Sequence, residues 1–257
     1  MADFGEIFRG LHAGAGPLVL PNAWDFASAA AFVAAGFPAV GTTSLGVAAV
    51  AGKPDGAGVT EAETIGLAER LAALPVPVSV DAEGGFGDAP RVAARLAELG
   101  IAGINLEDWG GDAGLLDTSV FADRIAQVKR SAPGLFVNAR TDAFWMDVPD
   151  PLPVALERVR AYAAAGADGV FVPKLAEPEH IEAIVRAVDV PLNVLFLPGR
   201  LTVAELGELG VRRVSMGSMP YRVALGAAVG AAQAVRDGGD VPAAPSYAEV
   251  AEMLSDA

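Results

Sequence analysis

The sequence predicts an α/β protein whose single domain is a (β/α)8 barrel, also called a TIM barrel. Short apolar segments alternate with longer helix-like segments eight times along the 257 residues, which is the pattern of a parallel barrel. Four of the helix-like segments end in glycine, followed by a short link and a new apolar run. No GxGxxG motif follows the first apolar segment, so an open dinucleotide-binding sheet is the weaker alternative.

The first four strand–helix units combine Val-rich strands with helices rich in Ala, Leu, Glu and Arg. Gly36 and Gly100 follow two of the helices, and glycine tolerates the left-handed backbone of a helix C-cap. Pro77 stands near the start of the third strand, where its missing N–H is tolerated. The expected strands are Leu18–Ala23, Ala39–Ser44, Val76–Glu83 and Gly103–Asp108, and the expected helices are Phe26–Ala35, Glu61–Leu74, Ala89–Leu99 and Ser119–Ser131.

The last four units repeat these signals. Gly166 and Gly210 fit helix C-caps, while Pro153 and Pro178 fit the first turn of a helix. The expected strands are Phe136–Asp142, Gly169–Lys174, Leu192–Leu197 and Arg213–Gly217, and the expected helices are Pro153–Ala165, Glu177–Val188, Val203–Leu209 and Tyr221–Asp237.

The chain ends in a segment with hinge-like composition. The sequence DGGDVPAAPS, from Asp237 to Ser246, leads into a short terminal helix at Tyr247–Leu254. We therefore interpret residues 1–257 as one barrel domain with residues 238–257 as a C-terminal arm. This arm is either a simple surface tail or a segment that packs on a neighbouring subunit.

Composition excludes several classes of function. The net charge of −14 argues against nucleic acid and against an anionic membrane surface as partners. The chain has no cysteine, which excludes disulfides, thiolate metal sites and cysteine catalysis. The N-terminal segment MADFGEIFRGLHAG lacks the basic region and the apolar core typical of a signal peptide, and we see no apolar run long enough to span a membrane. We expect a cytoplasmic enzyme.

Polar residues occur at the same end of successive apolar strands. In a (β/α)8 barrel the carboxyl ends of the strands meet at the active-site mouth. Asp81 and Glu83 close the third strand in the segment VSVDAEGGFGD, and Glu107 closes the fourth. Alternate residues of a strand point the same way, so we expect Asp81 and Glu83 to aim at one place.

This carboxylate cluster predicts a metal site. Mg2+ prefers oxygen ligands and takes one or two direct carboxylates, and Mn2+ is the alternative ion. We expect Asp81 to bind the metal directly, and Glu83, Glu107 and Asp55 to hold metal-bound waters. The alternative is that some of these acids pair with Arg140 or other cations, or with helix N-termini.

A second group of residues is suited to a carboxylate substrate. Arg140 lies in a strand ending at the predicted mouth, and its planar guanidinium fits a carboxylate. Thr43, Ser44 and Leu45 follow the second strand, where hydroxyl and N–H groups suit a second carboxylate, although an ordinary turn fits as well. The remaining candidates are Asn193 on the seventh strand, Trp24 and Trp109 as pocket walls, and Lys174 as a Schiff-base lysine or an ion-pair partner.

Six ordered motifs resemble those of the isocitrate lyase / phosphoenolpyruvate mutase superfamily. They are PNAWDFASA from Pro21, GTTSLG from Gly41, KPDG around Asp55, VDAEGGFGD from Val80, GINLED around Glu107 and NARTDAF around Arg140. The resemblance implies a Mg2+ site at Asp81, with Asp55, Glu83 and Glu107 in its water-mediated shell. It also implies that a 2-oxo or 2-hydroxy carboxylate is held by Thr43–Leu45 and Arg140.

The resemblance further implies homodimers or homotetramers that exchange the last barrel helix, which makes Tyr221–Ala257 an interface candidate. Two departures from the superfamily pattern occur. Glu83 stands where its members usually have Asp. The loop Trp109–Thr118 has neither the cysteine of the lyase branches nor the Lys and Asn of the phosphonate branches. A lyase reaction by the thiol route is therefore not expected.

These features together predict a Mg2+-dependent lyase or decarboxylase. Its substrate would be a small 2-oxo or 2-hydroxy di- or tricarboxylic acid, such as oxaloacetate or a malate- or isocitrate-like acid. The reaction would proceed through a metal-stabilised enolate, with Arg140, Glu107 and Asp55 as the catalytic candidates. The alternatives are a hydrolase or phosphonate P–C bond enzyme of the same superfamily, a Schiff-base aldolase, and a non-catalytic protein that binds 2-oxo acids.

Overall fold

The barrel closes through a first strand that is divided in two. The computed structural model describes residues 3–255, apart from the side chains of Asp112 and Ser255. Within these residues, parallel strands follow the order β1-β9-β8-β7-β6-β5-β4-β3-β2. Strand β1 (Leu18–Leu20) pairs with β9 (Arg213–Ser215), and β2 (Asn22–Ala23) pairs with β3 (Val40–Thr42).

The division falls at Pro21, which has no N–H to donate to the ladder. Its carbonyl still accepts a hydrogen bond from the Gly41 N–H at 2.8 Å. The predicted (β/α)8 barrel is therefore confirmed, with β1 and β2 as two parts of its first strand.

The remaining elements follow the predicted alternation closely. The other strands are β4 (Val78–Asp81), β5 (Gly103–Glu107), β6 (Phe136–Arg140), β7 (Gly169–Val172) and β8 (Leu192–Leu195). The helices that follow the strands are α2 (Phe26–Ala34), α4 (Glu61–Leu71), α5 (Ala89–Glu98), α6 (Thr118–Ser131), α7 (Pro151–Ala164), α8 (Pro178–Val185), α9 (Val203–Glu208) and α10 (Met219–Asp237). None of these described helices is long and apolar enough to cross a bilayer.

An additional helix, α1 (Phe4–Leu11), closes the N-terminal end of the barrel. The Asp3 side chain caps it by accepting a hydrogen bond from the Glu6 N–H at 3.1 Å. Phe8 is fully buried and meets the Phe136 ring at 5.3 Å between centroids. The His12 ring stacks on the same ring at 4.4 Å. This segment was not among the expected helices.

Helix α3 (Ser44–Val50) begins directly after β3, where the sequence suggested a turn. The close approach of α3 to Trp24 depends on Gly46. A Cβ atom at this position would lie 2.6 Å from the Cβ of Trp24, which is too close for any larger residue. The chain therefore turns from strand to helix without a loop, and Ser44 is fixed at the mouth.

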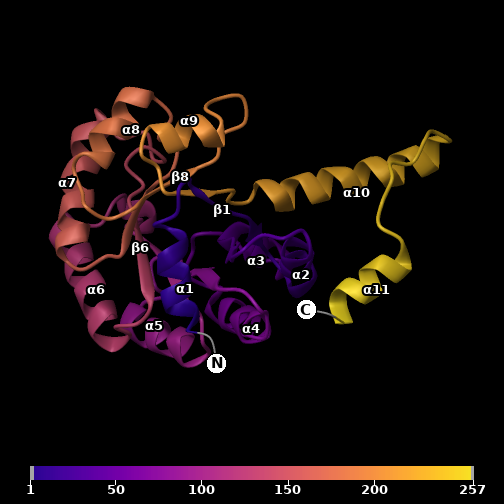
Figure 1. Ribbon diagram of the computed structural model, residues 1–257, viewed down its shortest axis with the longest axis horizontal. Coiled ribbons are helices and arrows are strands. Elements are labelled where there is room, and N and C mark those ends of the chain that lie inside the picture. Colours follow the sequence, from indigo (N-terminus) through magenta and orange to yellow (C-terminus); the bar gives the residue numbers. More distant parts are fainter. Residues whose placement is uncertain (1–2, 256–257) are drawn as a thin grey trace.

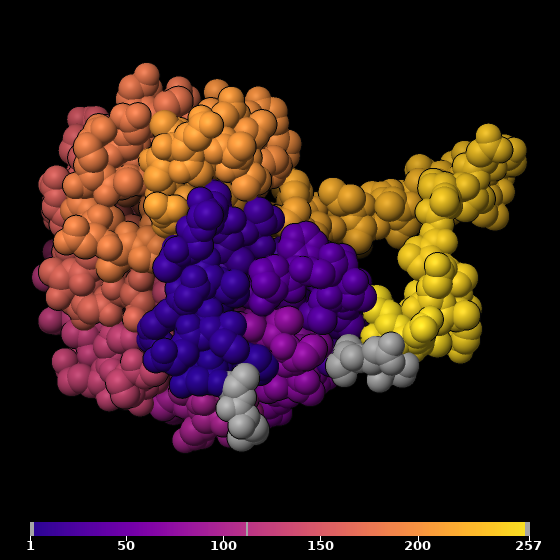
Figure 2. Space-filling view, viewed as in Figure 1, coloured from indigo at the N-terminus to yellow at the C-terminus, as the bar shows by residue number. Residues whose placement is uncertain are grey.

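Helix α10 extends away from the barrel instead of covering it (Figure 1). It has no buried residue, and its apolar side chains Val223, Leu225, Val229 and Val235 are exposed. Helix α11 (Tyr247–Ser255) follows and returns to contact α2. Figure 2 shows both helices outside the body of the barrel. The projecting part thus begins at α10, earlier than the predicted arm at residue 238, and residues 256–257 of that arm lie outside the described residues.

Candidate active site

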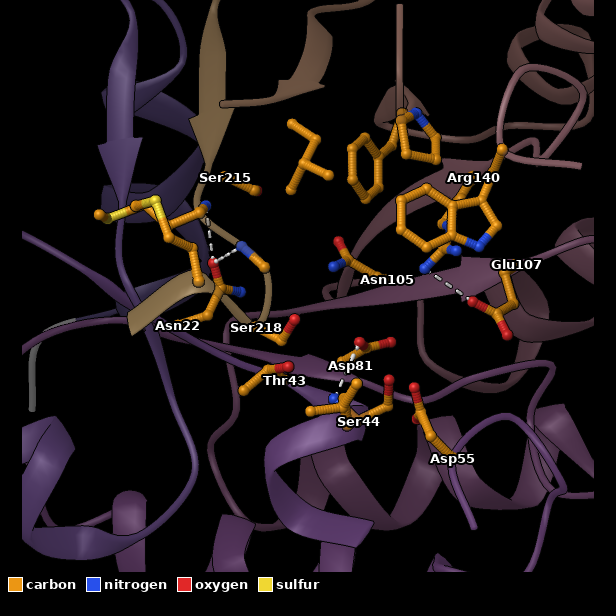
Figure 3. A pocket seen from close by; sticks show the side chains of 18 of the residues that line it. Asn22, Thr43, Ser44, Asp55, Asp81, Asn105, Glu107, Arg140, Ser215 and Ser218 are labelled. Carbon is orange, nitrogen blue, oxygen red and sulfur yellow. Dashed lines mark hydrogen bonds and ion pairs between the residues drawn. The ribbon is translucent and has the colours of Figure 1, made fainter. Parts of the chain in front are cut away.

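A cavity of about 530 Å3 opens at the carboxyl ends of the strands (Figure 3). Its volume falls in the range of small-molecule sites. On the side of β2 to β6 its lining is polar, and this polar side consists of Asn22, Thr43, Ser44, Asp55, Asp81, Asn105, Glu107, Arg140 and Asp142. Most of the predicted site residues therefore meet in one place, as the barrel rule requires.

Asp81 ends β4 and points into the cavity (Figure 3). Its Oδ2 atom accepts a hydrogen bond from the Ser44 N–H at 3.2 Å. Its own N–H donates to the Thr42 Oγ1 at 2.8 Å. Strand β3 and the start of α3 thus fix the Asp81 carboxylate at the mouth.

Burial raises the pKa of Glu83, which lies close enough to Asp81 and Asp55 for their charges to add to the increase, but its carboxylate does not line the cavity as that of Asp81 does. Its expected place in the water-mediated shell of a metal stays a prediction. The strand ends at Asp81, and Glu83 adopts a left-handed backbone with φ of 46°, which breaks the alternation of a strand. Glu83 is buried and does not line the cavity. Its carboxylate accepts hydrogen bonds from the Thr60 hydroxyl and from the Gly58 N–H.

These contacts give Glu83 a positioning role. They hold the loop between α3 and α4, which carries Asp55 to the cavity. Asp55 is exposed as a residue, but its side chain is hydrogen-bonded by Ser44. Partial desolvation raises the pKa of Asp55, and the nearby Asp81 carboxylate adds to the increase.

Glu107, Arg140 and Asp142 form a buried ionic cluster at the ends of β5 and β6. Arg140 lies 2.9 Å from Glu107 through Nη1 and 2.6 Å from Asp142 through Nε. Its guanidinium also lies over the rings of Trp145 and Phe171, at 5.9 and 5.7 Å. Burial lowers the pKa of Arg140, but the carboxylates of Glu107 and Asp142 outweigh this effect and keep the pKa above its ordinary value.

Burial raises the pKa of Glu107 to about 8, opposed by Arg140 and supported by the charge of Asp81. Asp81, Glu107 and Asp142 together carry more negative charge than Arg140 can neutralise. The cluster therefore favours either a bound proton or an additional cation.

The cavity lining fits a hard divalent cation. Asp55, Asp81 and Glu107 offer only oxygen donors, and their mutual repulsion would be relieved by positive charge. Among the described residues, no group of three or more acidic or histidine side chains converges as a complete ligand set. This is compatible with Mg2+, which takes one or two carboxylates and keeps several waters.

Three other predicted residues do not line the cavity. Trp24 packs its ring against Tyr221 at 5.4 Å between centroids. Asn193 is buried and donates a hydrogen bond to the Ser215 Oγ at 3.0 Å. The Lys174 Nζ lies 3.1 Å from both the Trp145 carbonyl and the Asp147 carboxylate. This ion pair supports the structural interpretation of Lys174 over the Schiff base.

The loop after Glu107 is held at its base by a buried ion pair. Trp109 lines the cavity, and the loop turns through a 3-10 helix at Gly111–Ala113. Arg158 lies 2.8 Å from Asp108 and donates to the Leu116 carbonyl at 2.8 Å. The loop is therefore anchored to α7.

Sequence reasoning missed the opposite side of the cavity. Strands β7 to β9 and the residues after them supply an apolar wall, which consists of Phe171, Leu195, Phe196, Leu197, Met216 and Met219. Apolar residues near strand ends look like ordinary core residues in a sequence. Arg222, from the first turns of α10, also lines the cavity. Ser215 could have been found, because it is a polar residue at the end of the last strand.

Comparisons with known proteins agree with this geometry. The sequence matches the family described as phosphoenolpyruvate phosphomutase over residues 8–236. An uncharacterized protein of Mycobacterium tuberculosis is 46% identical, over 97% of this chain and 96% of its own length. An oxaloacetate decarboxylase of Chromohalobacter salexigens is 32% identical, over 72% of this chain and 68% of its own. The crystal structure of a phosphoenolpyruvate phosphomutase from Streptomyces platensis subsp. rosaceus is 26% identical with a TM-score of 0.86, over 98% of this chain and 95% of that one.

The fold and the site are those of a (β/α)8 barrel protein. Its cavity is acidic, contains an arginine, and lies at the mouth where barrel enzymes act. The match over residues 8–236 then places the chain more narrowly. It belongs to the phosphoenolpyruvate phosphomutase family, within the phosphoenolpyruvate mutase/isocitrate lyase superfamily.

Proposed function

We propose that the protein is a Mg2+-dependent lyase or decarboxylase. Its substrate is a small 2-oxo or 2-hydroxy di- or tricarboxylic acid. The observation that carries this proposal is the meeting of Asp81, Asp55 and Glu107 with Arg140 in one cavity. A pocket that combines a cation site with a guanidinium suits an acid with adjacent carboxylate and oxo oxygens. The similarity to an oxaloacetate decarboxylase supports the same chemistry.

The residues of the cavity have separable roles in this reaction. Arg140 and the Leu45 N–H bind the substrate oxygens, because the Ser44 N–H already donates to Asp81. The N–H of Leu45 lies in the first turn of α3, where backbone donors have no intrahelical acceptor. A Mg2+ ion held by Asp81, with Asp55 and Glu107 on its water ligands, would supply further positive charge.

Decarboxylation requires little beyond this arrangement. The bond from the β-carbon to the departing carboxylate breaks, CO2 leaves, and the electron pair forms an enolate at the 2-oxo group. Positive charge near that oxygen stabilises the enolate. The β-carbon then takes up a proton, for which Glu107 and Asp55 are the candidate donors in the cavity.

The test is CO2 release from oxaloacetate, above its spontaneous rate, with Mg2+ and with EDTA. We expect activity with Mg2+, its loss in EDTA, and a fall of about a hundredfold or more in Asp81→Asn. Asp123→Asn, on the exposed face of α6, is the matched control and should keep wild-type activity. Equal activity in Asp81→Asn and the wild type would contradict the proposal.

A second function is favoured by the family match itself. Phosphonate P–C chemistry, or hydrolysis of a C–C bond, would use the same cavity. Phosphonopyruvate and oxaloacetate should therefore be compared in one assay that follows phosphate, phosphoenolpyruvate, pyruvate, oxalate and acetate. Phosphate or phosphoenolpyruvate from phosphonopyruvate identifies the phosphonate reactions, whereas oxalate and acetate from oxaloacetate identify the hydrolase. Binding of all these acids without any turnover would identify a binding protein.

We also propose a homodimer or homotetramer in the cytoplasm. Helix α10 supports the assembly, because it exposes Val223, Leu225, Val229 and Val235 and buries none of its residues against its own barrel. Light scattering during gel filtration measures the assembly directly. A monomer at micromolar concentration would contradict it.

A further inference from the structure

A fully buried arginine lies in the interior of the barrel, next to residues of the cavity. Arg213 begins β9 and is only 1% exposed. Burial lowers the pKa of Arg213 to about 9, so the guanidinium stays protonated at neutral pH. Among the described residues it forms no ion pair, and its Nη1 atom has no hydrogen-bond partner. A charge buried without a carboxylate partner costs free energy of folding, so stability alone gives no reason for this arginine.

The guanidinium of Arg213 reaches across the barrel interior from β9 to β5. Strands β6, β7 and β8 lie between these two strands in the sheet order. The Nε atom donates to the Ser215 Oγ at 3.2 Å, and Nη2 donates to the Asn105 Oδ1 at 3.1 Å. The two parallel N–H groups of a guanidinium usually bind both oxygens of one carboxylate. Here they hold two neutral oxygens, and both Ser215 and Asn105 line the cavity (Figure 3).

This contact fixes the orientation of the Asn105 amide. Arginine has donors only, so the atom of Asn105 that faces Arg213 must be the oxygen. The same Oδ1 also accepts a hydrogen bond from the Asn138 Nδ2 at 2.8 Å. Among the described residues, the Asn105 Nδ2 meets no acceptor, and it is not one of the enclosed atoms that lack a partner. Asn105 therefore offers the cavity a hydrogen-bond donor.

The position of Asn105 directs this donor to the proposed substrate site. Asn105 pairs in register with Asp81 of β4. Glu107 follows two residues later on β5 and points to the same side of the strand. A metal ion needs an electron pair from an oxygen ligand, which the Asn105 Nδ2 cannot give. A free N–H at this place instead suits an oxygen of a bound acid.

We propose that Asn105 is a further substrate-binding residue, which donates an N–H to an oxygen of the 2-oxo or 2-hydroxy acid, and that Arg213 is its positioning residue. The inference rests on the proposed function, because it takes the cavity to bind such an acid. It deepens that function by adding a neutral donor to the positive charge of Arg140. It also gives the buried charge of Arg213 a role in the site.

Binding of oxalate tests the inference without depending on turnover. Oxalate carries the adjacent oxygens of a 2-oxo acid, and it is titrated by calorimetry into the full chain with Mg2+. Arg213→Lys keeps the charge but cannot hold two oxygens with a planar fork. We expect Kd to rise about tenfold or more in Arg213→Lys and in Asn105→Ala, as for the loss of a hydrogen bond to a charged group.

A double-mutant cycle separates positioning from a general effect of charge or folding. If Arg213 acts through Asn105, Arg213→Lys should have no further effect on Kd in the Asn105→Ala background. Asn105→Asp provides a second variant if Asn105→Ala folds poorly, because its carboxylate pairs with Arg213 and offers no donor. Arg9→Lys is the matched control and should keep the wild-type Kd, because Arg9 contacts Asp168 and the Gly134 carbonyl and does not line the cavity.

Two results would overturn the inference. One is wild-type affinity for oxalate in Arg213→Lys or in Asn105→Ala. The other is equal weakening by Arg213→Lys in both backgrounds, which would give Arg213 a structural role only. CO2 release is measured separately: the expected cycle without turnover of any acid refutes the proposed function alone, whereas turnover with wild-type affinity in Asn105→Ala refutes the inference alone. Absence of oxalate binding to the wild type, together with absence of turnover, refutes both.

Discussion

The buried Asp108 carboxylate offers a sharp test of how this barrel mouth is held together. Asp108 has no exposed surface, and it accepts hydrogen bonds from Arg158 Nη1 at 2.8 Å and the Tyr162 hydroxyl at 2.6 Å. Its other oxygen accepts from the Asp142 N–H at 2.9 Å. Asp108→Asn keeps the size of the side chain but removes the charge. Arg158, only 8% exposed, is then left without its partner.

The magnitude follows from these contacts. The amide nitrogen of the new asparagine cannot accept a hydrogen bond. It would face either the two donors Arg158 and Tyr162 or the single donor Asp142 N–H, and the hydrogen bonds from the donors that it faces would be lost. Hydrogen bonds to charged groups contribute about 1.5–3 kcal/mol each, so losing two of them costs about 3–6 kcal/mol. Breaking a buried ion pair by removing one partner typically costs about 3–5 kcal/mol. We therefore expect the free energy of unfolding to fall by about 4 kcal/mol.

Urea unfolding followed by tryptophan fluorescence measures this loss. With a denaturant dependence of about 3 kcal/mol per molar urea, the midpoint should fall by about 1 M or more. Glu61→Gln is the matched control, because its pair with Arg91 at 2.8 Å is largely exposed and should contribute at most about 1 kcal/mol. If Asp108→Asn costs no more than the Glu61→Gln control, the reasoning from burial and pairing is refuted.

Three further predictions concern other parts of the chain. Burial lowers the pKa of His12 to about 4, so between about pH 6.5 and pH 4 the unfolded chain binds a proton that the folded chain does not. The free energy of unfolding should therefore fall by up to about 3 kcal/mol as the pH drops through this range. His12→Phe should reduce this pH dependence when it is measured by urea unfolding. Glu83→Gln should weaken the loop between α3 and α4 and accelerate amide hydrogen exchange at Gly58, whose N–H donates to the Glu83 carboxylate at 2.9 Å; an unchanged exchange rate would contradict the anchoring role. Gly46→Ala should lower stability by about 1–3 kcal/mol through overpacking. In contrast, Gly10→Ala, in helix α1 with nothing within 4 Å of the new methyl, should raise the melting temperature.

The barrel was predictable because its signals are local. Glycines such as Gly100 and Gly166 have positive φ in the structure, at 86° and 98°, as helix C-caps require. These glycines separate the eight strand–helix units, and the predicted bounds of each strand agree with the structure to within a few residues. Helix α1 escaped prediction, because no strand precedes it in the described chain and its position depends on the contact between Phe8 and Phe136, which lies more than a hundred residues away.

The candidate site was predictable for those residues that lie at the carboxyl ends of the strands. Asp81, Glu107 and Arg140 meet because the carboxyl ends of parallel strands meet. Glu83 did not follow this rule, because a left-handed residue after the strand redirects its side chain. Its contacts with Thr60 and Gly58 lie in a distant loop, which strand periodicity cannot describe.

The sequence by itself determined the barrel, the acidic and arginine-bearing mouth, and the absence of a thiol for chemistry, because periodicity, strand-end position and composition are properties of the chain. Only the tertiary structure decided that Glu83 anchors a loop, that Asp108 and Arg158 brace the mouth, and that β7 to β9 present an apolar wall to the cavity. These features depend on which distant side chains share a buried space, and burial sets both the charge and the hydrogen-bond partners that each side chain can keep.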